Sequence, residues 1–348
     1  MWFVRGLLRY LQGFLVLGLT IFSLDLKYMI KVGIIGADKP DAGELLRLLI
    51  NHPEVEIESL YSPAFAGRQI STCHHGFIGE RMLIFTDRID ISKVDAVFVV
   101  DDSQLGRTLI ENVELNDKLC IIDLSPNRMD KFFNNSLEYG LSEINRKPLV
   151  RGARMASIPS TVASLTLISL YPLVANSILS DELNIVVNAP EEFIGGIDVE
   201  KTINEIEKVL RNINGQFNSK ISMRLNAEGN GRTMRVIVDM SCPLAISEID
   251  TIYNSIYDDH NFTFTSLSKV GKEEVEGTQK CIISICKPGA GLVEIDTIGD
   301  CYMRGGAGDA VHVLNLLFAL HEKVGLCLKP SAFRRYDESS LRQTSWFA

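Results

Sequence analysis

The sequence predicts an α/β protein in two parts: a Rossmann-type, doubly wound parallel sheet, and a second α+β domain with a largely antiparallel sheet. The first part is indicated by residues 31–50, which have the pattern of a buried strand, a glycine turn and a helix with one apolar side. Further apolar strands are expected at 95–100 and 119–122, with a helix at 103–113 between them, and such alternation is typical of parallel sheets. The second part is indicated by strand-like runs at 219–225, 232–242, 281–286 and 291–297, with a covering helix at 246–257.

Length and composition limit the possible classes of function. The chain has 348 residues, of which 46% are hydrophobic, so it can form two domains with sizeable cores. Its formal net charge is −9 and no stripe of lysine and arginine offsets it, which argues against nucleic acid or an anionic membrane surface as a main partner. Seven cysteines are scattered without C-x-x-C pairs, as expected for a protein of the reducing cytoplasm.

Residues 1–28 differ from the rest of the chain. Arg5 and Arg9 precede an apolar stretch at 11–24 that is short for a membrane span, and no small-x-small cleavage site follows it. Met29 stands directly before the first predicted strand. We therefore interpret 1–28 as an upstream extension outside the fold, and a membrane anchor is the alternative interpretation.

The turn after the first strand has part of a dinucleotide-binding fingerprint. Gly33 and Gly36 have the spacing that lets a backbone approach a pyrophosphate, whose charge would lie on N–H groups at the start of the helix. Where the pattern needs its next glycine, the chain has Lys39 and then Pro40, which has no N–H, and acidic side chains lie on both sides. We expect the scaffold of a nucleotide site with a weakened grip on phosphate. The candidate cofactor-binding residues here are Gly33, Gly36, Ala37, Asp38, Lys39 and Ser62.

The second predicted strand and the loop that follows it indicate which cofactor or metal the chain could bind. The second predicted strand, 54–61, ends in Ser62 with no acidic residue to hold a ribose 2′-hydroxyl, which disfavours NAD. Cys73, His74 and His75 are adjacent, so their side chains point apart, and we interpret them as a polar loop. No metal cofactor is expected.

Several segments resemble one known family. The sequences YGLSEINR (139–146), AR (153–154) and IPSTVAS (158–164) have the order and nearly the spacing of YGLPELNR, AR and NPGCYPT in N-acetyl-γ-glutamyl-phosphate reductases, members of the semialdehyde dehydrogenase group. GIIGA at 33–37 and RGGAGDAV at 304–311 are similar to the family's GIVGA and KGAAGQAV. The resemblance covers most of residues 29–330.

The resemblance implies the organisation and partners of the chain. It implies a dinucleotide-binding domain at 29–157 and about 309–348, and a catalytic and dimerisation domain at 158–308. It also implies a role related to arginine biosynthesis and NADP as the cofactor, with Gly306 and Gly308 near it. We expect a small-molecule ligand, and a homo-oligomer or a hetero-oligomer with an active relative, because near-continuously apolar strands in the second sheet would need a covering partner.

The chemistry of the resembled family needs a cysteine thiolate that attacks the acyl phosphate, a histidine acid/base and hydride from NADPH. On this resemblance, Thr161 stands at the position of the cysteine, Ser160 stands at that of the preceding glycine, and Pro159 is retained. A slip of one residue would place Ser160 at the nucleophile position instead. No cysteine occurs at 121–241 and no histidine at 76–259, so the segment that holds both groups in the family has neither.

Other possible replacements for these two groups are weaker. The helix expected at 198–213 carries Lys201 near the position of the family histidine, and we interpret that lysine as a solvated residue. Cys301, beside Arg304 and a glycine cluster, is the best outside candidate for a nucleophile. Three further cysteines lie in apolar strands and are expected in the core, namely Cys242, Cys281 and Cys286.

The C-terminal part of the chain is expected to be structural. His312 lies in a helix predicted at 308–322 and is interpreted as a packing residue. The tail after Pro330 is polar with little periodicity, and we expect a surface or partly disordered segment.

Three functions follow, in this order of preference. The first is a reductase-like protein that has kept the fold and lost the reaction, because the glycine turn, the nucleophile and the base are all replaced. The second is an active NADPH-dependent reductase of an N-acyl-γ-glutamyl phosphate that uses Thr161 or Cys301. The third is a module that binds a nucleotide or a small acidic metabolite, with Lys39 and Ser62 near its phosphate.

Overall fold

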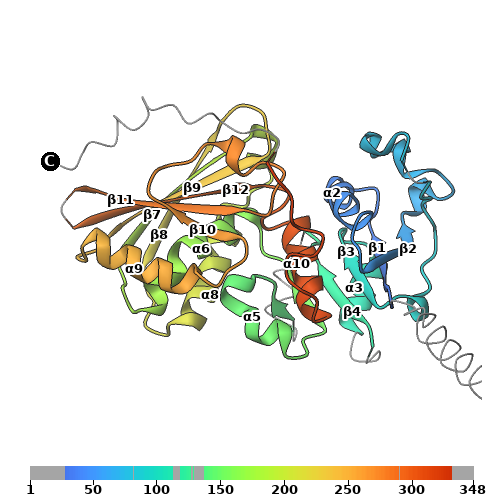
Figure 1. Ribbon diagram of the computed structural model, residues 1–348, viewed down its shortest axis with the longest axis horizontal. Helices are drawn as coiled ribbons and strands as arrows, with labels where there is room; N and C mark the ends of the chain where they lie inside the picture. The colour runs from blue at the N-terminus through green and yellow to red at the C-terminus, as the bar shows by residue number, and fades with distance from the viewer. Residues whose placement is uncertain are drawn as a thin grey trace, which may run out of the picture.

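The computed structural model describes residues 28–330 apart from 81, 113–117, 127, 129–136 and 290. The extension expected at 1–28 lies outside these residues except for Tyr28, and so does the tail after Pro330. Figure 1 shows two sheets at opposite ends of the described chain, with helix α10 (Ala307–Leu317) between them.

The first sheet is parallel throughout, in the order β2-β1-β3-β4-β6-β5. Its strands are β1 (Ile30–Ile35), β2 (Val55–Tyr61), β3 (Ala96–Val99), β4 (Cys120–Asp123), β5 (Glu138–Tyr139) and β6 (Met155–Ser157). The central strands β1, β3 and β4 are almost wholly buried because helices cover both faces: α2 (Pro40–Leu49) and α10 on one, α3 (Gln104–Glu111) on the other. The predicted strands, glycine turn and helices of this part are confirmed.

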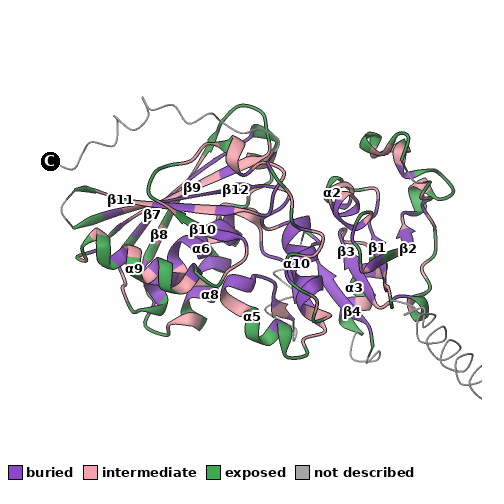
Figure 2. Cartoon of the chain, in the orientation of Figure 1, coloured by how far each residue is buried: buried purple, intermediate pink, exposed green. Residues whose placement is uncertain are grey.

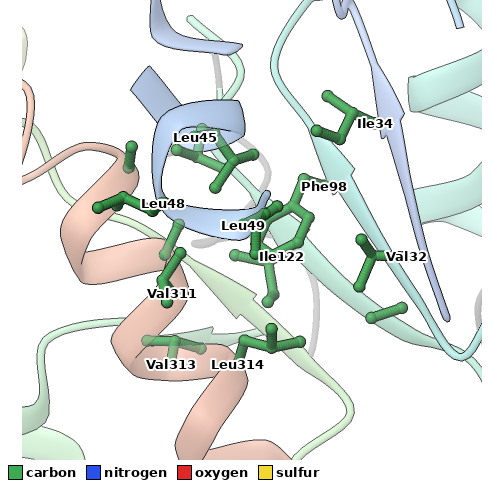
Figure 3. Close-up of a cluster of buried hydrophobic side chains, with 14 of the residues drawn as sticks. Val32, Ile34, Leu45, Leu48, Leu49, Phe98, Ile122, Val311, Val313 and Leu314 are labelled. Carbon is green, nitrogen blue, oxygen red and sulfur yellow. The ribbon is translucent and has the colours of Figure 1, made fainter. Parts of the chain in front are cut away.

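Helix α10 connects the end of the described chain to the first sheet. Its apolar side chains pack against those of α2 and of the strands beneath, and Figure 3 shows this cluster, which includes Leu49, Phe98, Ile122, Val311 and Leu314. The helix ends five residues before the predicted end. The side chain of Asn315, in the last turn of the helix, donates hydrogen bonds to the carbonyls of Glu322 and Val324 beyond the helix end. These two bonds hold the following segment in a non-helical turn.

The second sheet is mixed, in the order β10-β11-β12-β9-β7-β8. Its strands are β7 (Glu182–Ala189), β8 (Lys220–Ala227), β9 (Thr233–Ser241), β10 (Thr263–Ser266), β11 (Cys281–Gly289) and β12 (Leu292–Asp300). The three inner pairs are antiparallel and the two outermost pairs are parallel, which confirms a largely antiparallel sheet. The sequence pattern identified neither β7 nor β10 as a strand. The helices of this part are α6 (Thr161–Ala175), α7 (Glu191–Ile194), α8 (Val199–Ile213) and α9 (Ile246–Tyr257), whereas α5 (Ser142–Val150) lies between β5 and β6 of the first sheet and packs against α10.

Burial corrects two expectations about this second sheet. Its strands were expected to be near-continuously apolar, yet β9 alternates: every second residue is buried, while Arg235 and Asp239 are half-buried. The buried side chains form one cluster with those of α6, α8 and α9, so only they need to be apolar. Figure 2 marks the buried and the less buried residues of these strands and helices by colour. Cys286, expected in the core, is exposed near the end of β11 beside Glu294, whereas Cys242 and Cys281 are buried as predicted.

His312 is a packing residue, as predicted. It is buried in α10, where its Nε2 lies 2.8 Å from Glu322 and its ring lies edge-on to Phe262. Within the described ranges, no helix has both the length and the apolar character needed to cross a bilayer.

Candidate functional site

A pocket of about 650 Å³ opens where the two parts of the chain meet. Its walls are the start of α6, helix α8, the segment 301–306 that follows β12, and residues 126 and 128 that follow β4. Asp41 from the first turn of α2 also lines it. The carboxyl ends of parallel strands are where α/β proteins place their ligands, so the position of the pocket is that of a ligand site.

Thr161, the residue at the expected nucleophile position, lies on the pocket wall at the start of α6. Ser160 is the N-cap of this helix and its hydroxyl accepts a hydrogen bond from the N–H of Ala163. The hydroxyl of Thr161 donates a 3.0 Å hydrogen bond to the carbonyl of Cys301. No histidine is among the described residues that line the pocket. The proton of this hydroxyl is therefore directed at a carbonyl and not at a base.

Cys301 lines the same pocket but is only 5% exposed. Burial, reinforced by the neighbouring Asp300 carboxylate, raises the pKa of the thiol far above its ordinary value, and Arg232 offsets this only in part. A thiol becomes nucleophilic as a thiolate, and this environment disfavours the thiolate.

Arg128 supplies a fixed positive charge to the pocket wall. Its Nε donates to the carbonyl of Ile158, its Nη1 to those of Leu124 and Ser125 at 3.0 and 3.1 Å, and its Nη2 to that of Pro159 at 3.1 Å. These acceptors are backbone carbonyls, so they hold the guanidinium in place without neutralising it. Sequence reasoning missed Arg128, although a cation soon after a buried parallel strand is a usable signal.

Glu205 places a buried carboxyl group in the pocket wall. It is 4% exposed on α8, and Tyr139 Oη donates a 2.7 Å hydrogen bond to its Oε1. Burial raises the pKa of Glu205 to about 7, although the bond from Tyr139 and the charge of Arg128 act to lower it. Sequence reasoning grouped this residue with its helix and assigned it no role; Lys201, on the same helix, is exposed and also lines the pocket.

The glycine turn forms a second cluster, and its donors are used within the fold. Gly36 has a φ of +78°, and a Cβ there would lie 2.8 Å from the side chain of Asp101, so glycine is required. The N–H groups of Gly36 and Ala37 both lie 3.1 Å from the carbonyl of Tyr61. Lys39 is the N-cap of α2 and Pro40 its first residue, so that position offers no N–H.

Charge in this turn is paired locally. The ammonium group of Lys39 lies 3.0 Å from the carboxylate of Asp38. Although burial acts to raise it, the pKa of Asp38 is lowered by hydrogen bonds that include the one from Lys39. The ammonium group of Lys39 is therefore already paired with the carboxylate of Asp38, and both charges would meet a phosphate that entered this turn. The buried Ser62 hydroxyl at the end of β2 also faces Asp38, and its interaction with that carboxylate contributes to the lowered pKa.

The loop after β2 covers this turn. His74 Nε2 lies 2.7 Å from the carbonyl oxygen of Ala37, and its ring approaches α2 so closely that a Cβ on Gly43 would lie 2.7 Å from Nδ1. The described part of the chain contains no group of three or more histidine, cysteine, aspartate or glutamate side chains that could hold a metal ion.

The remaining sequence candidates occupy different places. Gly306 lines the pocket with Ser160 and Thr161. Pro159 is buried and contributes its carbonyl to Arg128. Gly33 and Gly308 are positions of close packing, where a Cβ would lie 2.5 Å from Ile89 and 1.9 Å from Gln279 respectively.

A cluster of charges joins the two parts of the chain beside the pocket. Arg232, next to β9, reaches Glu44 of α2 at 2.6 Å and Asp300 at 2.5 Å. Asp300 also accepts hydrogen bonds from the backbone N–H groups of Gly277, Tyr302 and Met303. This one carboxylate therefore positions both Arg232 and the start of the 301–306 segment.

We expect Gly305→Ala to destabilise the protein by at least about 2 kcal/mol, because Gly305 has a φ of +67° and a Cβ there would lie 2.3 Å from the backbone nitrogen of Thr161. Thermal unfolding measures this effect. Gly215→Ala is the control, since a Cβ there meets nothing within 4 Å and its φ is not positive. Equal melting temperatures for the two variants would contradict the close approach of segment 301–306 to α6.

A parallel sheet with a glycine turn, joined to a mixed sheet with a pocket between them, is a fold that this chain shares with solved semialdehyde dehydrogenases. The family model described as semialdehyde dehydrogenase, NAD binding domain, matches residues 31–151. Aspartate semialdehyde dehydrogenase with NADP from Candida albicans superposes with a TM-score of 0.65, at 14% identity, over 85% of this chain and 99% of that one. Aspartate semialdehyde dehydrogenase II from Vibrio cholerae, complexed with ASA, gives a TM-score of 0.62 at 12% identity over 84% of this chain and 98% of that one. These likenesses establish the fold alone.

Within this class, the chain belongs to the N-acetyl-γ-glutamyl-phosphate reductase family. It is 33% identical to the protein of that name from Parabacteroides distasonis, and the match covers 88% of this chain and all of the relative. The protein of the same name from Azobacteroides pseudotrichonymphae is 35% identical, again over 88% of this chain and all of the relative. The resemblance found in the sequence is thus confirmed as a family relationship, and the matched domain points to a nicotinamide cofactor as the family's ligand.

Proposed function

We propose that this protein is a reductase-like member of its family, related to arginine biosynthesis, that has lost the reductive reaction and acts by binding a small ligand. The observation that carries the proposal is the hydrogen bond from Thr161 to the carbonyl of Cys301. An alcohol attacks an acyl phosphate only when a base removes its proton, and a backbone carbonyl is not a base. Cys301, the one thiol among the described residues that line the pocket, is held in its neutral form by burial.

NADP is the cofactor that the family relationship suggests, and the residues of the glycine turn do not fit its pyrophosphate. The amides of Gly36 and Ala37 already donate to Tyr61, and Pro40 has none to donate. The carboxylate of Asp38 would repel a phosphate, and it also engages the ammonium group of Lys39. We therefore propose that NADP binds weakly or not at all.

When NADPH is titrated into the purified protein and its fluorescence is recorded, we expect no saturable binding below about 1 mM. We also expect no loss of NADPH when an N-acyl-γ-glutamyl phosphate is then added. The Parabacteroides distasonis relative, assayed in parallel, is the positive control. Tight binding with turnover would reject the proposal in favour of an active reductase. Loss of that turnover in Thr161→Ala or in Cys301→Ala would then identify the nucleophile.

A second candidate function is that of a module that binds a nucleotide or a small acidic metabolite, and the pocket favours it. Its volume of about 650 Å³ and its cations, Arg128, Lys201 and Lys208, suit a small anionic ligand. This role is compatible with loss of the reaction, and we expect it to be exercised in the cytoplasm.

We also propose that the chain forms a homo-oligomer, or a hetero-oligomer with an active relative. The support is the family relationship and the strand face of the second sheet that lies opposite α6, α8 and α9. Light scattering at micromolar concentration should give a mass that is a multiple of 38.7 kDa, the mass of one chain. A monomer mass would reject the homo-oligomer, and co-purification with the active relative would then test the alternative.

A further inference from the structure

Glu205 is a buried carboxyl group whose position in the pocket has no structural explanation. Buried carboxylates are usually paired with a cation, because removing a charge from water is costly. The Oε1 atom of Glu205 accepts a hydrogen bond from Tyr139, and no described side chain forms an ion pair with the residue. Its charge, when present, is compensated only in part, by the hydrogen bond from Tyr139 and by the charge of Arg128, and burial outweighs both.

This carboxyl group titrates in the physiological range. Burial raises the pKa of Glu205 to about 7, so the group carries a proton on a large fraction of molecules at neutral pH. In that form it is a hydrogen-bond donor inside the pocket. An acid that can donate is suited to the oxygen of an anionic ligand, to which a carboxylate could offer only repulsion.

The other charged groups of the pocket decide the sign of the ligand. The 15-residue helix α6 begins here, so the positive end of its dipole faces the pocket, and Arg128 adds a fixed charge beside it. Lys201 and Lys208 lie on the α8 wall, and Asp41, Glu192 and Asp198 are the carboxylates that line the same pocket. Lys201, Lys208 and these three carboxylates are all exposed, so water screens both signs of charge, although burial acts to raise the pKa of Asp41. The sign is therefore decided by the helix end and by Arg128, whose charge acts on the buried Glu205.

We propose that the pocket binds a small carboxylate ligand with uptake of a proton, because Glu205 in its acid form donates a hydrogen bond to an oxygen of that ligand. This inference rests on the proposed function, in which the pocket binds and does not reduce. Binding then strengthens as the pH falls through the neutral range. Tyr139 is the positioning residue, since its hydroxyl donates to Oε1 and holds the carboxyl group in the pocket wall.

Calorimetric titration of the purified protein with N-acetyl-L-glutamate tests the proposal. Repeating the titration at pH 6, 7 and 8, in two buffers of different ionisation enthalpy, counts the protons taken up. We expect the Kd to rise by up to about tenfold per pH unit above pH 7, with close to one proton taken up at pH 8. A Kd that does not change with pH, or no binding at pH 6 with millimolar ligand, would overturn the proposal.

Three variants separate this explanation from a general effect of pH. Glu205→Gln keeps a donor but does not titrate, so its Kd should be constant from pH 6 to 8 without proton uptake. Tyr139→Phe removes a hydrogen bond that lowers the pKa of Glu205, so the midpoint of the pH dependence should move upward. Glu207→Gln, on the same helix but paired with Arg211 at the surface, should behave as the unmodified protein.

Failure of this inference is distinguishable from failure of the proposed function. NADPH turnover is measured on the same protein batch: turnover would reject the loss of the reaction whatever the pH dependence. Absence of turnover combined with pH-independent binding would reject only the role of Glu205.

Discussion

Arg304→Met should lower the stability of the protein by about 3–5 kcal/mol, because it removes the cation from between two buried carboxylates. Arg304 is fully buried, 2.7 Å from Glu143 and 3.3 Å from Asp309. Both carboxylates would remain buried and lose their shared partner. Differential scanning fluorimetry should show a fall in melting temperature of roughly 6–15 °C at pH 7.

The pH dependence of this effect has a definite sign. Burial acts to raise the pKa of Glu143, but the charges of Arg304, His260 and His312 and the hydrogen bond from Thr263 together outweigh it and lower that pKa to about 2. A lowered folded-state pKa stabilises the fold above the unfolded pKa of about 4.3, and this contribution is lost as the pH falls toward 2. The difference between the Arg304→Met variant and the unmodified protein should therefore be constant from pH 7 to about 5 and shrink as the pH is lowered from about 4 toward 2.

Arg211→Met is the matched control. Arg211 is half exposed and pairs with Glu207 four residues earlier on the surface of α8, a geometry worth a few tenths of a kcal/mol. A similar loss of stability in the two arginine variants, or a loss in Arg304→Met that does not change with pH, would contradict the buried triad.

Asp300→Ala should cost about 3–5 kcal/mol and also remove ligand binding in the pocket. Asp300 is fully buried, and it accepts hydrogen bonds from Arg232 and from the backbone of Gly277, Tyr302 and Met303. Without it, Arg232 keeps one carboxylate partner, Glu44, and segment 301–306 loses its anchor. Thermal unfolding and the N-acetyl-L-glutamate titration measure the two effects.

Asp239→Ala is the control for Asp300→Ala. Asp239 lies in the same sheet, where burial and the nearby Glu294 raise its pKa, so its removal should be neutral or slightly stabilising. If Asp300→Ala unfolds too readily for titration, Asp300→Asn retains the shape and tests the charge alone. Normal stability and normal ligand binding in Asp300→Asn would show that the charge of this residue is dispensable.

Local pattern was sufficient for most of the fold. The apolar run in β1 and the glycine turn before α2 were readable because burial on both faces needs a continuous apolar strand. The helix at 246–257 agrees with α9 at both ends. Strand β7 was missed although its first four residues alternate between exposed and buried, and β10 was missed because it has only four residues and its one apolar side chain, Phe264, is exposed. Cys286 was predicted to be buried, but it lies in the last part of β11, where the strand leaves the core.

The sequence by itself determined the family, the two sheets and the absence of cysteine from 121–241, because these depend on residue identity and local periodicity. Only the tertiary structure decided what the pocket can do. The hydrogen bond from Thr161 to Cys301 joins residues 140 positions apart, and that from Tyr139 to Glu205 joins residues 66 apart. The pKa of Glu205 follows from burial, which is a property of the assembled fold and of no single segment.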